Sequence, residues 1–217
     1  EKSVSRYLQK PKSMFIALAV SVLLLGLAAA QVFAVSAALY FADLQEASIE
    51  NPENTWLDAA EILSFSNPDV FVARAKFLRQ KALLPELKDQ RAEILNETLS
   101  NLARAVEQRP LWPYYHLSEL NILVLLGAES SEVQSKVDEV LLLAPNERGL
   151  DKHFLELAFH SWDKLSLEQR QWMLKRLVIV PGNTLRYVFS VAKNLNRQSV
   201  ICTNLPYKKI KRLCKAR

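Results

Sequence analysis

The chain has 217 residues, of which half are apolar and only four are glycine. Few glycines beside many leucines and alanines argue against a sheet-rich fold with tight turns, so we expect an all-α protein. The net charge of +5 conceals a segregation, because residues 43–168 carry 12 basic and 22 acidic side chains whereas residues 169–217 carry 12 basic and no acidic ones.

Residues 13–42 contain no charged side chain, and this run predicts a membrane anchor. A bilayer core needs about 20 apolar residues, so the run can span it with a tilt or extend beyond the lipid. The alternative is a cleaved signal peptide with "LAAAQ" as its cleavage site, although the apolar part of such a peptide is typically about 7–15 residues long.

The charges that flank this run are of opposite sign. The positive-inside rule therefore places the N-terminus in the cytoplasm and everything after residue 42 outside it. Lys2, Arg6, Lys10 and Lys12 precede the run, and Asp43, Glu46, Glu50 and Glu53 follow it. We thus expect a basic N-terminus over residues 1–13, an anchor over 14–42, a helical domain over 43–200 and a basic tail over 201–217.

Small residues recur every four positions in the anchor, on one face of a helix. They are Gly26, Ala30, Ala34, Ala38 and Ala42. A seam of this kind lets another membrane helix approach closely. The other interpretation is that alanine is merely abundant here, and the sequence leaves both open.

The domain after the anchor shows helical spacing of apolar residues, punctuated by prolines. Helices are expected over residues 57–65, 68–85, 95–109, 113–127, 131–143, 147–162, 166–181 and 183–196. Capping boxes are expected at Ser131 with Gln134 and at Ser166 with Gln169, and Asn183 is expected to cap the last helix. Prolines 110, 145 and 181 are 35 and 36 residues apart, close to the tetratricopeptide period of about 34, which predicts an irregular, tetratricopeptide-like stack of helical hairpins.

The segment "PLWPYYHL", residues 110–117, gathers aromatic side chains at the start of one predicted helix. Pro113 suits the first helical turn, where its missing N–H would be unpaired anyway. Trp112 and Tyr115 are the candidate aromatic contacts. They either pack against the preceding helix or stack on a sugar, because flat aromatics with polar tips serve both purposes.

The stretch "HFLELAFH" places His153, Glu156 and His160 on one helix face. Imidazole and carboxylate groups bind metal ions, but two turns separate the histidines and no second motif supports a site. A solvated or partner-facing stripe is the preferred interpretation. The chain also lacks the glycine-rich nucleotide motifs and the serine-nucleophile motif, so we expect no catalytic residue, no metal site and no cofactor.

The basic end contains the only two cysteines, Cys202 and Cys214, which form a candidate disulfide if this part lies outside the cytoplasm. The candidate anion-binding residues are Lys208, Lys209, Lys211, Arg212 and Lys215, interleaved with the apolar Ile210 and Leu213. Anionic lipid headgroups, an anionic polysaccharide or the acidic body of another copy could bind them. The alternative is a solvated, loose end.

The chain resembles the VpsP-like exopolysaccharide biosynthesis proteins of Gram-negative bacteria. The resemblance rests on the basic N-terminus, the anchor, the degenerate helical repeats, the basic end and the segments "RPLWPYYHLSELNIL" and "LAPNERGLDKHFLELAF". This resemblance implies a role beside glycosyltransferases, a polymerase and export proteins, and it supplies no catalytic residues. The function expected is that of a membrane-anchored scaffold that acts through protein–protein contacts, with a possible homo-oligomer and no nucleic-acid partner. Direct binding of an anionic polysaccharide through the basic end is the alternative, and a glycan-processing enzyme is a third reading that no paired carboxylates support.

Overall fold

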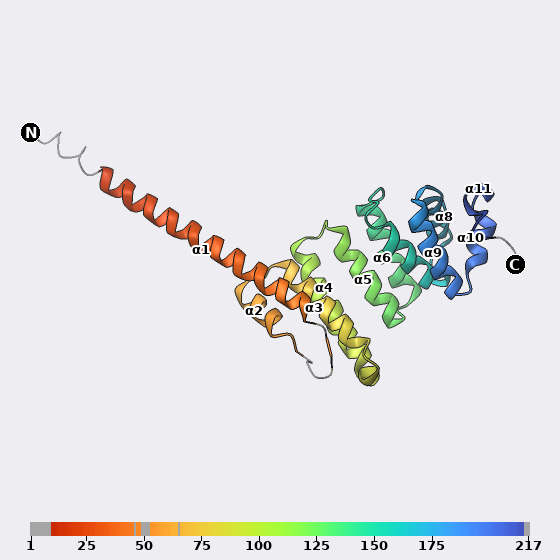
Figure 1. Cartoon of the computed structure of the whole chain (residues 1–217), viewed down its shortest axis with the longest axis horizontal. Coiled ribbons are helices and arrows are strands. Elements are labelled where there is room, and N and C mark those ends of the chain that lie inside the picture. Colours follow the sequence, from red (N-terminus) through yellow and green to blue (C-terminus); the bar gives the residue numbers. More distant parts are fainter. Residues whose placement is uncertain (1–9, 46, 49–52, 65, 215–217) are drawn as a thin grey trace, which may run out of the picture.

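The computed structural model describes residues 10–45, 47–48, 53–64 and 66–214, with side chains from Met14 onward. Every regular element in this part of the chain is helical, and it contains no strand, which confirms the all-α prediction. One long helix, α1 (Lys10–Leu44), projects from a stack of shorter helices that follow one another in sequence order (Figure 1). The expected charges at Lys2, Arg6, Glu46, Glu50, Lys215 and Arg217 lie outside the described residues.

The helix α1 has 35 residues, a length of about 50 Å at about 1.5 Å per residue. Its segment Met14–Leu44 is long and apolar enough to cross a membrane. Residues 14–30 are exposed along their whole length. From Gln31 onward one face of the same helix is covered by protein, with Val35, Ala38 and Ala42 buried.

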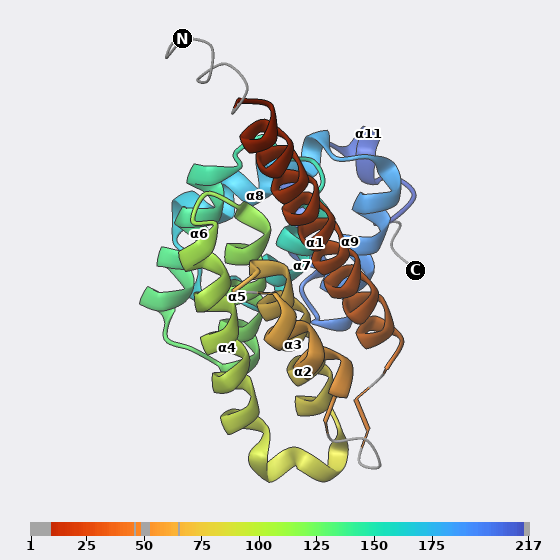
Figure 2. The same ribbon diagram turned by 90° about the vertical axis from the view of Figure 1, so that its left-hand side faces the viewer.

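The covering element is α2 (Thr55–Leu63), which forms a hairpin with the last turns of α1 (Figure 2). Both ends of this hairpin are tied by a hydrogen bond to a helix-terminal carbonyl. The side chain of Gln31 donates to the carbonyl oxygen of Leu63 at 2.8 Å. At the other end, buried Asn54 donates to the carbonyl oxygen of Ala42 at 3.0 Å and accepts from the N–H of Leu57. The hairpin is therefore fixed at two points about three helical turns apart.

The remaining helices form the stack. They are α3 (Pro68–Ala82), the 3-10 helix η2 (Pro85–Gln90), α4 (Arg91–Gln108), α5 (Pro113–Leu126), α6 (Ser130–Leu143), α7 (Asp151–His160), the 3-10 helix η3 (Trp162–Lys164), α8 (Leu167–Ile179), α9 (Gly182–Asn194), α10 (Gln198–Asn204) and α11 (Tyr207–Ile210). Prolines 110, 145 and 181 each stand two residues after the end of α4, α6 and α8, where a proline cannot continue the helix. The second helix of three successive hairpins ends in this way, as the proline spacing predicts.

Local end signals explain most of the boundaries. Pro113 occupies the first turn of α5, and Gly127 ends that helix with a φ of 73°, a left-handed conformation that favours glycine. The capping box of Ser166 and Gln169 precedes α8 as predicted. A capping box at Ser131 and Gln134 is wrong, because Glu129 and Glu132 form it instead and α6 begins at Ser130. The carboxylate of Glu129 accepts the backbone N–H that a serine hydroxyl accepts in the usual capping box.

Three further expectations are corrected. The helix α7 begins at Asp151 and not at residue 147, since residues 145–150 form turns. Asn183 does not cap α9, which begins at Gly182, and its side chain accepts from the N–H of the next residue. The basic end is not a separate loose tail as far as residue 214, because α11 places Ile210 in the core beside Leu213.

The largest apolar core belongs to the second half of the chain. It extends from Leu117 on α5 to Ile210 on α11 and includes fully buried Phe159, Met173 and Ile201. The first half is held by smaller clusters, of which one joins α1, α2 and α3 through Val35, Ala38, Ala60 and Val70. The apolar core is therefore larger in the second half of the stack than beside α1.

Candidate functional site

A groove of about 640 Å³ crosses the stack. It is lined by the first helix of four successive hairpins, α3, α5, α7 and α9, together with part of α4. Apolar side chains such as Leu117, Val124 and Leu125 form its floor. Extended concave surfaces of stacked helical units are what repeat proteins use to bind partners, so this groove is the candidate functional site.

The stripe His153, Glu156 and His160 faces this groove from α7. Both histidines are exposed, and Nδ1 of His153 lies 3.5 Å from Oε2 of Glu156. No three His, Cys, Asp or Glu side chains gather closely enough to hold a metal ion in the part of the chain that the structure describes. The stripe therefore lies in the groove, where both histidines are accessible.

Tyr187 of α9 lines the groove together with this stripe. Burial and a hydrogen bond to Glu156 raise the pKa of its phenol above the ordinary value, and the ammonium group of Lys152 lies 4.3 Å from its ring centroid. Glu156 is thus engaged by Tyr187 and by His153. Lys76 and Arg79 of α3 also line the groove and are opposite in charge to Glu156.

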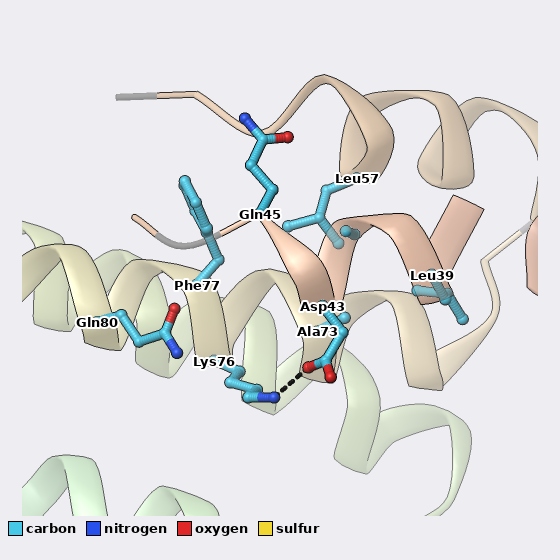
Figure 3. Close-up of a pocket in the computed structure, with 9 residues that line it drawn as sticks. Leu39, Asp43, Gln45, Leu57, Ala73, Lys76, Phe77 and Gln80 are labelled. Carbon is cyan, nitrogen blue, oxygen red and sulfur yellow. Dashed lines mark hydrogen bonds and ion pairs between the residues drawn. The ribbon is translucent and has the colours of Figure 1, made fainter. Parts of the chain in front are cut away.

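Lys76 also belongs to a second, smaller pocket at the joint of α1, α2 and α3, shown in Figure 3. Its ammonium group forms an ion pair with Asp43, near the end of α1. Leu39 and Leu57 line the apolar side of this pocket. One side chain therefore connects the wall of the groove to the end of α1.

The aromatic segment "PLWPYYHL" sends its side chains in different directions. Tyr114 lines the groove. Tyr115 is buried, with 4% of its surface exposed, and its hydroxyl donates to Asp69 at 2.8 Å while accepting from Arg109 at 3.2 Å. Burial and the Asp69 carboxylate raise the pKa of Tyr115. Packing accounts for Tyr115, whereas Trp112, 48% exposed, and Tyr114, 40% exposed, are both accessible to solvent or a ligand.

His116 anchors the start of α5 to α6. Its Nε2 lies 2.7 Å from the carbonyl oxygen of Pro110 and its Nδ1 lies 3.1 Å from Glu139. Lys136 donates to both Glu119 and Glu139. Burial opposes the charged forms, but these contacts outweigh it and raise the pKa of Lys136 while they lower that of Glu139. The network fixes the helices on which the middle of the groove is built.

The small-residue seam of α1 divides into two parts. Ala38 and Ala42 are buried against the chain's own α2 and α3. Gly26 and Ala30 are exposed and Ala34 is half-buried, and a Cβ added at Gly26 would meet no heavy atom within 4 Å. Only the part of the seam before Ala34 is left for another membrane helix.

The basic end is ordered around a disulfide between Cys202 and Cys214, whose Cα atoms are 5.8 Å apart. Lys208, Lys211 and Arg212 are exposed. Lys209 instead donates to the carbonyl oxygens of Val178 and Val180 at the end of α8, where a cation is favoured by the helix dipole. The fifth candidate, Lys215, lies outside the described residues.

Several other cations of the basic quarter also have partners within the chain. The guanidinium of Arg176 is buried and donates to Asp151 at 2.5 Å. Arg197 pairs with Asp163 at 2.5 Å. The segregation of charge along the sequence therefore overstates the positive surface that the folded protein offers.

Comparison of the chain with protein-family models, with curated proteins and with solved structures found no match. The function is therefore argued from the arrangement of this chain's own residues.

Proposed function

We propose that the protein is a single-pass membrane-anchored scaffold whose groove holds a segment of a partner protein. The observation that carries the proposal is the groove itself, because four successive hairpins contribute to it and no single hairpin contains it. Its lining combines apolar side chains with a few charged and polar ones, which suits one face of an amphipathic helix. The stacked hairpins, similar to tetratricopeptide repeats, favour binding over chemistry.

The proposed setting is the synthesis or export of an exopolysaccharide, on the strength of the resemblance to VpsP-like proteins. The partners would then be membrane proteins of that machinery. The apolar helix α1 would hold the scaffold in the inner membrane, with the N-terminus in the cytoplasm and the stack in the periplasm, as the flanking charges favour. The disulfide between Cys202 and Cys214 is consistent with an oxidising compartment.

The groove can be tested by a substitution that fills it without disturbing the core. Asn121 is half-buried and lines the groove from α5, so Asn121→Arg should block a partner segment and remove most of the secreted polysaccharide in a complemented deletion strain. Ser135→Arg, at an exposed position of α6 outside the groove, is the matched control and should secrete normally. Both variants should reach the membrane in equal amounts.

A photo-crosslinking amino acid at Asn121 should capture a polymerase, glycosyltransferase or export protein, and the same amino acid at Ser135 should not. Normal secretion by Asn121→Arg would contradict the groove as the functional surface. Loss of secretion by both substitutions alike would show that the stack is merely sensitive to added charge.

A second candidate function is direct binding of an anionic polysaccharide. It is favoured by Lys208, Lys211 and Arg212, which are exposed on an end that the disulfide and Ile210 hold in place. Replacing these three residues by Gln should abolish retention of the protein on an acidic polymer, and the wild-type retention should weaken steeply with added salt. Retention that ignores both changes would exclude this function.

A further inference from the structure

The level at which α1 leaves a bilayer can be derived from its length and its contacts. A span of about 20 residues that begins at Met14 ends near Phe33. Gln31 lies just before this point, and its side chain is bonded to the carbonyl oxygen of Leu63. The C-terminal end of α2 is therefore beside α1 where the span ends, with no linker between the bilayer and the stack.

The turn between α4 and α5 lies at the same end of the stack. Val35 of α1 and Val70 of α3 share one apolar cluster. The neighbour of Val70, Asp69, accepts hydrogen bonds from Arg109 at 3.2 Å and from Tyr115 at 2.8 Å, on either side of this turn. In Figures 1 and 2, the turn after α4 lies at the end of α4 that faces the projecting part of α1, and η2 lies at the other end of α4.

Three large apolar or aromatic side chains are exposed at this end. Ile62 is 80% exposed, Leu111 is 78% exposed and Trp112 is 48% exposed. One side of the indole of Trp112 is supported by Tyr114, with ring centroids 5.6 Å apart. Among the charges beside them, Arg109 pairs with Asp69, and Glu61 pairs with Arg74 and Arg104. Tryptophan with apolar neighbours is the side-chain chemistry enriched where a protein meets the headgroup level of a membrane.

We propose that Ile62, Leu111 and Trp112 form a bilayer-contact surface that inserts into the outer headgroup region beside α1. This contact goes beyond the scaffold function and rests on its anchor, because α1 must span the membrane to bring the surface there. Two contacts, α1 and this surface, would then hold the stack against the membrane in one orientation. A partner protein or a sugar could also cover this surface, but neither would bring lipid acyl chains into contact with the indole of Trp112.

The test uses the full chain reconstituted into vesicles of phosphatidylethanolamine and phosphatidylglycerol, with or without acyl-chain-brominated lipid. Bromine quenches tryptophan fluorescence on contact, and the chain contains Trp56, Trp112, Trp162 and Trp172. The wild-type protein should be quenched, and Trp112→Phe should lose most of the quenching. Trp56→Phe is the matched control, because Trp56 is at the start of α2, away from Leu63, and stacks on Phe41; it should be quenched like the wild type.

Leu111→Ser provides a second variant that keeps all four tryptophans. It should reduce the quenching while leaving the helical circular dichroism unchanged. If Trp112→Phe is quenched as strongly as the wild type, the bilayer contact is overturned although the anchor stands. If alkali extracts the wild-type chain from the vesicles, the anchor fails and the contact fails with it.

Discussion

The hairpin of α1 and α2 and the helices from α7 to α11 are held together in different ways. The hairpin relies on two small apolar clusters and on hydrogen bonds from Gln31 and Asn54 to helix-terminal carbonyls. The later helices share one continuous core, closed at the end of the chain by a disulfide. Burial of apolar surface is the larger source of stability, so the later helices should be the last part to unfold. The hydrogen bonds of Gln31 and Asn54 fix the orientation of α2 along α1 more than they add to the free energy of unfolding.

The largest effect should come from the centre of the large core. Phe159 is fully buried and its ring stacks on Trp162, with centroids 5.2 Å apart. Phe159→Ala should lower the free energy of unfolding by about 3–5 kcal/mol, because it removes buried surface and leaves a cavity. Urea unfolding of the detergent-solubilised protein measures this loss. Leu167→Ala, at an exposed position, should change the free energy little, and equal effects of the two would contradict the core assignment.

The buried ion pair in the same region should have the next largest effect. Asp151→Ala leaves the guanidinium of Arg176 buried without its partner, which should cost about 3 kcal/mol, at the lower end of the range for a broken buried pair. The double variant Asp151→Leu with Arg176→Met should recover most of this loss, because no unpaired charge remains. A double variant no more stable than Asp151→Ala would show that the pair holds the helices by geometry.

The disulfide should matter less and more locally. Cys202→Ser with Cys214→Ser releases a loop of 12 residues in sequence separation, and the expected loss is about 2–3 kcal/mol. Hydrogen exchange should rise in α10 and α11 and at the end of α8, whose carbonyls Lys209 caps. Unchanged exchange there would mean that Ile210 alone holds the end of the chain. Hydrogen exchange in the α1 and α2 hairpin, which has no disulfide among the described residues, is the reference for the protection that the Cys202–Cys214 bond adds.

The smallest effect should come from the hairpin. Asn54→Ala removes the cap of α2 and the bond to Ala42, and a lost cap costs about 1–2 kcal/mol. Exchange should increase at the first turn of α2 while the later helices stay protected. Asn67→Ala, which removes the cap of α3, is the control for a cap that does not touch α1. Global unfolding on Asn54→Ala would contradict the division of the molecule into two regions.

Much of the fold follows from local signals in the sequence. Pro113, Gly127 and the capping box at Ser166 act within a few residues of themselves, so they mark helix ends wherever the helices are packed. The proline spacing predicts the hairpins for the same reason. Errors arise where two possible caps compete, as at Glu129 and Ser131. They also arise where a polar turn such as 145–150 directly precedes a helix, because polar residues are common in both a turn and a first helical turn.

The site was less predictable because it depends on contacts distant in sequence. An uncharged run does not reveal whether lipid or protein surrounds it, so the seam of α1 could not be divided at Ala34 in advance. The groove residues Arg79 and Asn121 carry no motif, and only the stacking of α3, α5 and α7 brings them together. Lys209 resembles its neighbours in sequence, yet it alone of the four described candidates is bonded to the end of α8. The stripe at His153 was the one part of the wall with a visible pattern.

The uninterrupted course of α1 has a consequence for the direction in which the groove faces. The helix α1 is unbroken between residues 14–30 and the residues that pack against α2. Any rotation of α1 about its axis therefore rotates the stack by the same angle. One residue inserted after Leu27 would turn the stack by about 100° about the helix axis, whereas an insertion of seven residues would return it to within about 20° of its original bearing and raise it by about 10 Å. Where α1 spans a bilayer, the helical phase of α1 therefore sets the direction in which the stack faces, and the length of α1 sets the height of the stack above the bilayer.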